Sequence, residues 1–168
     1  GNTITQRDAA ANMAIAEACR IINDGDADAM VVGATGTTLT TSVHEHSSST
    51  DSDFAGPFDA VCRPFDKRRQ GSVPGEGAGV IVLEEMHSAL QRGASIYGEI
   101  LGAASASCVG RDRSLACKNG LVNAMRQTLQ RADLATERLG HIHAHGLGTV
   151  TSDFAEAQAI RQVFGESA

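Results

Sequence analysis

Apolar and polar positions along the chain follow two alternating periods, one typical of helices and one typical of strands. Residues 9–23 are rich in Ala and carry apolar side chains around the whole circumference, which predicts a buried helix. Asp8 precedes this stretch and offers a short acceptor suited to an N-cap. A short strand is expected over 2–5 and a buried parallel strand over 29–33, so this region predicts an α/β unit.

The remaining pattern continues the alternation after one interruption. Between residues 36 and 59 the periodicity disappears and Thr and Ser dominate, which indicates a long surface loop. The further predicted elements are a strand over 77–84, a helix over 88–92, a strand over 96–101, an amphipathic helix over 115–133, a strand over 140–144 and a helix over 153–163.

Composition narrows the class of protein. A chain of 168 residues with 42% hydrophobic and 20% charged residues fits one ordinary globular domain. A net charge of −6 argues against binding to nucleic acid or to an anionic membrane, and no apolar run is long enough to span a membrane. The four cysteines are scattered without a C-x-x-C pair, which favours a reducing, cytoplasmic setting. Because the chain starts without Met and stops just after a predicted helix, we expect an incomplete piece of a longer protein.

Several short patterns suggest chemistry, and each has a plainer interpretation. His141, His143 and His145 alternate on one predicted strand, but ligands spaced in this way are too splayed to converge on one metal ion. The glycines of 75–79 precede a strand, whereas a dinucleotide loop follows one, so a tight turn is favoured. His44 and His46 lie in the Ser/Thr loop. The basic cluster Arg63, Lys67, Arg68 and Arg69 is interpreted as a charged face able to dock an acidic partner.

Three segments in fixed order carry a more specific signal. Residues 64–84 read PFDKRRQGSVPGEGAGVIVLE, which strongly resembles the signature of beta-ketoacyl synthases. Residues 144–149, AHGLGT, resemble the histidine motif of the same family and are followed by Ser152, Asp153 and Glu156. The helix from Ala14 to Asp28 resembles the one that follows the family's nucleophile. The resemblance covers essentially the whole chain and corresponds to the middle of a family member.

The resemblance implies a thiolase-like α/β fold, in part, with residues 1–92 ending the N-terminal half and 93–168 starting the C-terminal half. It implies an acyltransferase of fatty-acid or polyketide biosynthesis, dimeric and without a cofactor or metal. In the family reaction a cysteine takes an acyl group from an acyl carrier protein. Malonyl-carrier protein then loses CO2, and the resulting carbanion attacks the acyl thioester. The expected partners are therefore acyl carrier protein, with its phosphopantetheine-linked acyl and malonyl groups, and a second synthase subunit.

The family register also assigns site residues, with one departure at the nucleophile. His145 matches the family histidine that contacts the enolate or the thioester carbonyl. Thr149 keeps a hydroxyl that contacts the pantetheine arm, and Leu147 stands where a second such hydroxyl is usual. Asp8 stands where the catalytic cysteine belongs. A carboxylate there is a poor acyl acceptor, and at ~4 Å with an effective dielectric of ~20 it would repel the malonyl carboxylate by about 4 kcal/mol.

Two functions from different classes remain open at this point. The first is a condensing acyltransferase of the beta-ketoacyl synthase type. The second is a non-condensing homologue, either a partner subunit similar to a chain-length factor or a malonyl decarboxylase. A metal-binding or nucleotide-binding module rests only on the weaker patterns. Because helix 9–23 needs partners on all sides, we expect the isolated segment to associate obligately or to expose apolar surface.

Overall fold

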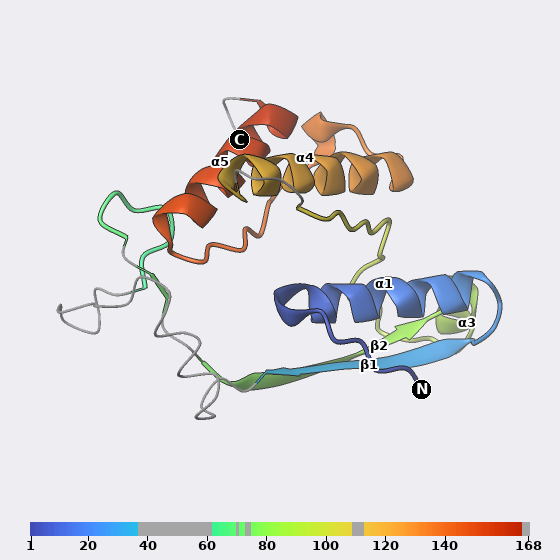
Figure 1. Ribbon diagram of the computed structural model, residues 1–168. Helices are drawn as coiled ribbons and strands as arrows, with labels where there is room; N and C mark the ends of the chain where they lie inside the picture. The colour runs from blue at the N-terminus through green and yellow to red at the C-terminus, as the bar shows by residue number, and fades with distance from the viewer. Residues whose placement is uncertain (37–61, 70, 73–74, 109–112, 166–168) are drawn as a thin grey trace. The chain divides into compact units, whose positions relative to one another are not determined.

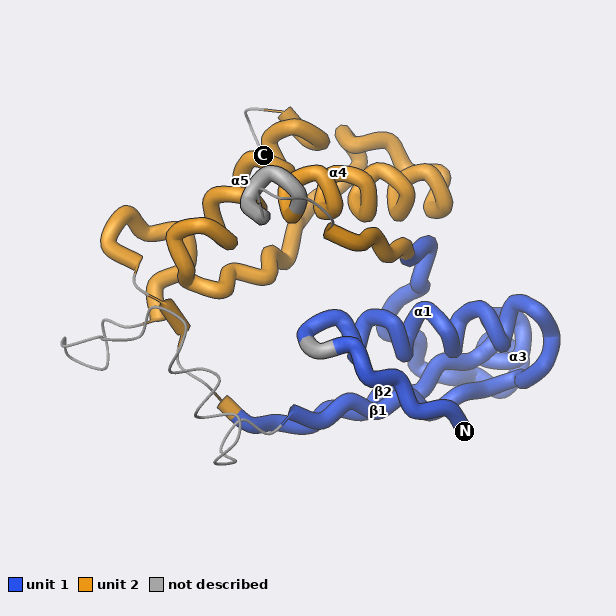
Figure 2. The backbone as a smooth tube through the Cα atoms, viewed as in Figure 1, with its two compact units in different colours: residues 1–37, 76–103 blue, residues 38–75, 104–168 orange. Residues whose placement is uncertain are grey.

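The computed structural model describes the chain except residues 37–61, 70, 73–74, 109–112 and 166–168. The described residues form two compact units that interleave along the chain (Figure 2). Unit 1 comprises Gly1–Thr37 and Glu76–Ala103, and unit 2 comprises Thr38–Gly75 and Ala104–Ala168. The predicted Ser/Thr loop over 36–59, with His44 and His46, falls almost entirely outside the described residues.

Unit 1 is a helix packed on a two-stranded antiparallel sheet (Figure 1). A 3-10 turn, η1 (Arg7–Ala9), leads into α1 (Ala10–Asn23), and β1 (Ala29–Gly36) pairs with β2 (Gly77–Glu84). The ladder runs from Ala29 opposite Glu84 to Gly36 opposite Gly77. The strand predicted over 29–33, which is β1, was expected to be parallel and buried. It is antiparallel, and among its residues only Val32 is buried.

The core of unit 1 is narrow. Ala18 of α1 and Val32 of β1 are buried, whereas the other apolar side chains of the helix are half-buried. The prediction of a helix over 9–23 is confirmed, but the prediction that it is buried on all sides is wrong within this unit. Gly25 ends the helix region with φ 78°, and the N–H of Asp26 donates to the carbonyl of Ile21, which closes the C-terminal turn.

A short helix completes unit 1. In α3 (Met86–Gln91) the Glu85 carboxylate accepts hydrogen bonds from the backbone N–H groups of His87, at 2.9 Å, and Ser88, at 2.7 Å. These bonds hold the pKa of Glu85 below its usual value. The cap explains why the helix begins before residue 88, where it was predicted to begin.

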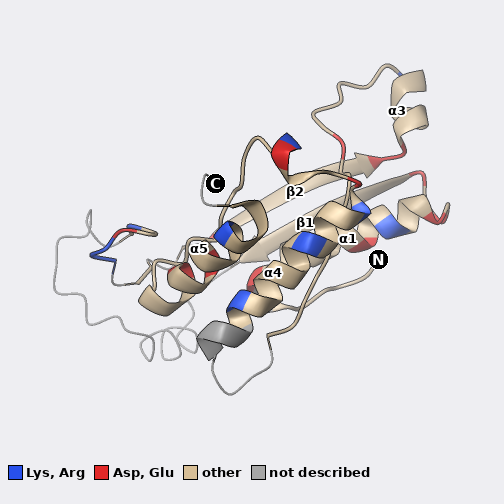
Figure 3. Ribbon diagram, turned by 90° about the horizontal axis from the view of Figure 1, so that it is seen from above, with Lys and Arg blue, Asp and Glu red and all other residues tan. Residues whose placement is uncertain are grey.

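Unit 2 is built on two packed helices. Helices α4 (Arg113–Arg131) and α5 (Val150–Phe164) contact each other, with Val122, Ala155 and Ala159 buried. A 3-10 turn, η3 (Thr136–Arg138), lies between them in sequence, and a segment without regular secondary structure over 140–148 leads into α5. In Figure 3 the ribbon is coloured at the charged residues; the sequence of α4 contains Lys and Arg and no Asp or Glu. None of the described helices is long and apolar enough to cross a membrane.

Three predicted strands do not form in the described part of the chain. Residues 2–5, 96–101 and 140–144 have no ladder partner there and are assigned no regular structure. Their alternation of apolar residues fits a strand, but a strand also requires a neighbour whose backbone groups pair with its own. The helices predicted over 115–133 and 153–163 are confirmed as α4 and α5.

Candidate active site

The AHGLGT segment turns directly into the first turn of α5. Thr149 is the N-cap, and its Oγ1 accepts a hydrogen bond from the Ser152 backbone N–H at 3.2 Å. The backbone of Thr149 is extended, as a cap residue requires. Because Oγ1 acts as an acceptor in this bond, the Thr149 hydroxyl still has a proton to donate.

Asp153, in the first turn of α5, is the most enclosed charged residue of the described chain. It is 1% exposed, and its two oxygens accept from backbone N–H groups on two different segments. Oδ2 accepts from Phe65 at 2.7 Å, and Oδ1 accepts from Gly148 at 2.8 Å. A carboxylate at a helix N-terminus is also favoured by the helix dipole. Asp153 therefore joins the segment that carries the PFD sequence to the histidine segment, although they lie far apart in sequence.

Arg69 completes this junction. Its Nε lies 3.5 Å from Asp153 Oδ2 and donates to the Thr149 carbonyl at 3.2 Å. The other guanidinium nitrogens donate to the carbonyls of Asp66, at 2.9 Å, and Val150, at 2.8 Å. Arg69 was predicted to belong to an exposed charged face, and this is wrong, because only 13% of its side chain is exposed. Lys67 and Arg68 are exposed, as predicted.

Glu156, one turn further along α5, holds the backbone of the histidine itself. It is 5% exposed, and its carboxylate accepts from the N–H groups of His145 at 2.7 Å and Gly146 at 3.0 Å. Asp153 and Glu156 are three residues apart and so lie on the same face of α5. Together they fix both ends of the stretch from His145 to Gly148 while the His145 side chain stays exposed.

The glycines of this loop are required by close approaches. Gly148 has φ 82°, and a Cβ on it would lie 2.3 Å from the Gly71 carbonyl oxygen. The Gly71 N–H donates to the Gly148 carbonyl at 3.0 Å, so the two backbones lie against each other. Gly146 has φ 58°, and a Cβ there would lie 3.1 Å from Pro64 Cβ. No larger residue fits position 148 without moving the backbone.

Phe65 adopts a backbone conformation that a bulky residue rarely adopts. Its φ is 64°, in the left-handed region, where a Cβ-bearing aromatic residue is strained. Its N–H is the group that Asp153 holds at 2.7 Å. We conclude that the hydrogen bond to Asp153 helps to stabilise this turn, and that the turn places the Phe65 ring beside the histidine segment.

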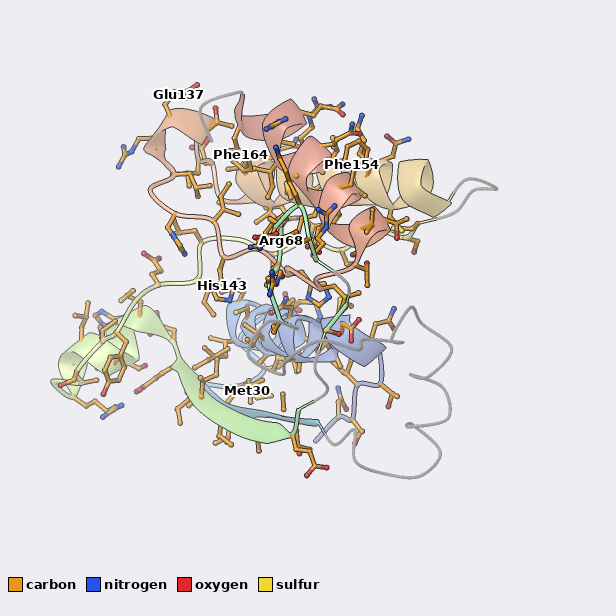
Figure 4. All side chains as sticks on the ribbon, turned by 90° about the vertical axis from the view of Figure 1, so that its left-hand side faces the viewer. Met30, Arg68, Glu137, His143, Phe154 and Phe164 are labelled. Atoms are coloured by element: carbon orange, nitrogen blue, oxygen red, sulfur yellow. The ribbon has the colours of Figure 1, made fainter. Side chains whose placement is uncertain are left out.

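A cleft of about 650 Å³ opens in unit 2 beside these elements. Its lining mixes apolar and ionisable side chains, among them Phe65, Glu137, His141, Ile142, Arg161 and Phe164. Figure 4 labels Glu137 and Phe164, which line it from η3 and α5. His145, Leu147 and Thr149 do not line this cleft, so it is distinct from the predicted site residues.

The segment that carries His141, His143 and His145 is not organised as a metal site. His141 and His143 have ring centroids 6.4 Å apart with planes tilted by 57°. Within the part of the chain that the structure describes, no group of three or more His, Cys, Asp or Glu side chains is arranged to hold a metal ion.

The predicted nucleophile position lies in unit 1. Asp8 is exposed in η1, and the N-cap of α1 is Ala9, which makes no side-chain capping bond. The prediction that Asp8 caps this helix is therefore wrong: the 3-10 turn runs into the helix without an extended cap residue. Within unit 2 the structure relates His145, Leu147 and Thr149 to one another, and within unit 1 it relates Asp8 to α1.

Two family models match the chain in comparison with known proteins. Residues 2–89 match the family described as beta-ketoacyl synthase, N-terminal domain, and residues 97–168 match its C-terminal domain. The chain is 35% identical over 170 residues to 3-oxoacyl-[acyl-carrier-protein] synthase 2 of Staphylococcus aureus, covering all of the chain and 42% of that protein. It is 38% identical over 164 residues to the Synechocystis protein of the same name, covering 95% of the chain and 39% of that protein. The chain thus spans less than half the length of these curated relatives.

Solved structures of ketosynthases are also similar to this chain. A beta-ketoacyl synthase from Burkholderia phymatum aligns with a TM-score of 0.82 and 30% identity, over 94% of this chain and 39% of its own. A ketosynthase of a type II polyketide synthase, solved with its acyl-carrier protein, aligns with a TM-score of 0.83 and 31% identity, over 95% and 40%. The ishigamide ketosynthase/chain length factor aligns at 0.78 and 30%, over 93% and 37%. The predicted thiolase-like fold, present in part, is confirmed.

Proposed function

Because the chain belongs to the beta-ketoacyl synthase family, we propose that the protein carrying it is an acyltransferase of the beta-ketoacyl-[acyl carrier protein] synthase type. Its substrates are thioesters carried on acyl carrier protein in fatty-acid or polyketide biosynthesis. The observation that carries the proposal is the fixed loop around His145, whose backbone is held by Glu156 and whose side chain is left exposed. We place the boundary between the two ketosynthase halves at residues 92 and 93.

His145 is proposed to stabilise the enolate. When malonyl thioester loses CO2, the carbon–carbon bond breaks and its electron pair passes to the thioester carbonyl oxygen. An imidazole N–H aimed at that oxygen lowers the barrier because it donates where negative charge develops. Such a donor must already be in position, and the two backbone hydrogen bonds to Glu156, at 2.7 and 3.0 Å, restrict where the His145 side chain starts.

Thr149 and Leu147 are proposed to contact the pantetheine arm of the carrier protein. Thr149 accepts the helix-capping bond and so keeps its hydroxyl proton for a substrate carbonyl. Leu147 offers only apolar contact where a hydroxyl would add a hydrogen bond, and losing one such bond costs on the order of 1 kcal/mol. We expect weaker binding of the carrier-linked substrate than a hydroxyl at both positions would give.

Asp8 decides which half of the family reaction the protein performs. Condensation needs a thiolate that accepts the acyl group and later leaves as the enolate attacks the acyl carbonyl. A carboxylate would form an anhydride instead, which is far less stable than a thioester. This residue therefore favours the second candidate, a non-condensing homologue that decarboxylates malonyl thioester or serves as the partner subunit of an active synthase.

The partners follow from the same family membership. One solved relative is a ketosynthase in complex with its acyl-carrier protein, and another is a ketosynthase paired with a chain length factor. By analogy we propose that this protein binds acyl carrier protein and pairs with itself or with a synthase subunit, in the cytoplasm. No cofactor or metal is required by the proposed chemistry.

The decisive experiment separates decarboxylation from condensation. The full-length protein is incubated with labelled malonyl-carrier protein and an acyl-carrier protein, and CO2 and beta-ketoacyl product are measured separately. We expect CO2 without product from a decarboxylase. Product from the unaltered protein would overturn the argument from Asp8, and the absence of both signals would indicate a silent partner subunit.

A variant pair sharpens this test at the nucleophile position. Asp8→Cys supplies the missing thiol, and we expect it to gain product formation. Asp8→Ala removes the carboxylate without adding a nucleophile and is the matched control. If both variants release CO2 but neither forms product, residue 8 is not the nucleophile position. His145→Ala should abolish CO2 release in the unaltered protein and in both Asp8 variants.

A further inference from the structure

Two cysteines of unit 2 that the proposed reaction does not use lie against each other at the start of α4. The side chain of Cys117 lies near enough to Cys108 to contribute to a raised pKa of the Cys108 thiol. Cys108 is exposed and Cys117 is half-buried, and both are free thiols. They are nine positions apart in sequence, with Cys117 on the helix and Cys108 on the segment that leads to it.

An adjacent glycine provides independent geometry for the same pair. A Cβ on Gly120 would lie 2.8 Å from Cys108 Sγ and 3.5 Å from the Ser107 carbonyl oxygen. The segment at Ser107 and Cys108 therefore crosses α4 directly over this glycine. Residues three apart on a helix share a face, so Cys117 lies one turn from the point at which the Cys108 sulfur rests.

We propose that Cys108 and Cys117 form a reversible intramolecular disulfide when the protein meets a two-electron oxidant such as a peroxide. In the first step a thiolate attacks a peroxide oxygen and the O–O bond breaks, giving a sulfenic acid and hydroxide; the hydroxide becomes water when it takes up the proton that the thiol released. In the second step the other thiol attacks that sulfur and a second water leaves, so that two thiols and hydrogen peroxide give one disulfide and two waters. Sulfur is oxidised and the peroxide is reduced. The bond would tie the segment before α4 to its first turns.

Partial desolvation and the neighbouring Cys117 thiol raise the pKa of Cys108 above its usual value. The thiolate is the reactive form, so oxidation at neutral pH should be slow and should accelerate as the pH rises. The other cysteines serve as references: Cys62 is exposed, and Cys19 is half-buried in α1.

The test uses the full-length protein treated with hydrogen peroxide and then blocked, digested with trypsin and examined by mass spectrometry. Cleavage after Arg92, Arg111, Arg113 and Lys118 places Cys108 and Cys117 on separate peptides, 93–111 and 114–118. The proposal expects these peptides to be joined, with the loss of two hydrogens, and to separate on reduction. Joined peptides with Cys62 instead, or oxidation of Cys108 to sulfinic acid without a joined pair, would overturn it.

Two variants distinguish a built pair from chance cross-linking. Cys62→Ser removes the exposed thiol and should leave the joined peptide unchanged. Gly120→Ala places a methyl group where the Cys108 sulfur lies, so the sulfur must turn away, and we expect most of the joined peptide to be lost. If Gly120→Ala retains stability and cross-links as fast as the unaltered protein, the contact over Gly120 does not organise the pair and the proposal fails.

Discussion

The most constrained residue of the site is Asp153, because three groups depend on one buried carboxylate. It accepts from the Phe65 and Gly148 N–H groups and lies 3.5 Å from the Arg69 guanidinium. A buried charge is tolerated only where it is paired and hydrogen-bonded. Asp153 therefore connects the loop around His145, the turn at Phe65 and the start of α5 through its hydrogen bonds and its ion pair.

Replacing this carboxylate should be severe. Asp153→Ala leaves two backbone N–H groups and the nearly buried Arg69 without their acceptor. Breaking a buried pair by removing one partner costs about 3–5 kcal/mol, so we expect a loss of that order in the free energy of unfolding. Urea denaturation of the full-length protein, followed by circular dichroism, measures it.

The control is Arg68, which is adjacent to Arg69 in the same turn. Arg68 is 77% exposed at the side chain and pairs with Asp66 at 3.4 Å. Since exposed ion pairs contribute little, Arg68→Ala should unfold at the same urea concentration as the unaltered protein. Equal destabilisation by both variants would show that the turn, and not the Asp153 junction, sets stability.

At this scale sequence reasoning identified the loop but not what holds it. The AHGLGT resemblance pointed to His145 and Thr149, and the positions of Asp153 and Glu156 were recognised as matching the family pattern. The contacts between the start of α5 and the PFD segment could not be predicted, because Phe65 lies 88 residues from Asp153 in sequence and Arg69 lies 80 residues from Thr149. A run of basic residues gives no sign of which one turns inward.

At the scale of elements, the start of α5 depends on Thr149. The sequence predicted a helix from Asp153, whereas the helix begins at Val150 because the Thr149 hydroxyl oxygen receives the Ser152 N–H at 3.2 Å. Thr149 was assigned to substrate contact, and its capping role was missed. The signal was present in the sequence as Thr149, a residue type suited to an N-cap, followed by the acidic Asp153 in the first turn.

The two roles of Thr149 can be separated. Thr149→Ala removes the cap and the hydroxyl, and we expect it to lower the free energy of unfolding by about 1 kcal/mol and to raise KM for the carrier-linked substrate. Thr149→Ser keeps the oxygen and should leave both quantities close to their original values. Thermal unfolding and steady-state kinetics measure them. A raised KM in the serine variant would mean that the methyl group, not the hydroxyl, contacts the substrate.

Helices and strands differed in how well they could be predicted, and the reason is physical. A helix satisfies its backbone groups within one segment, so α1, α4 and α5 emerged from local periodicity. A strand is completed by another strand, and residues 96–101 and 140–144 have none in the described part of the chain. The hairpin of β1 and β2 formed because both of its strands are present.

At the scale of the whole chain, one face of the β1–β2 sheet exposes apolar side chains. Val31 lies opposite Val82 in the ladder, and Val80 lies two positions from Val82, so these three side chains share the face opposite buried Val32. They are 72%, 65% and 67% exposed, respectively. The expectation that this segment exposes apolar surface is therefore confirmed, and it is consistent with a chain that spans less than half of its relatives.

The 168-residue segment alone is therefore expected to self-associate. Apolar side chains gathered on one face favour association through the hydrophobic effect. The triple variant Val31→Thr, Val80→Thr, Val82→Thr should remove most of this self-association, while its β-branched residues remain suited to strands. Light scattering and binding of a hydrophobic dye measure both effects. Val32→Thr is the matched control: Val32 is 7% exposed, so the change destabilises unit 1 and should increase dye binding. A segment that stays monomeric and dye-silent, or a triple variant that associates as strongly as the original, would show that this face is not what drives association.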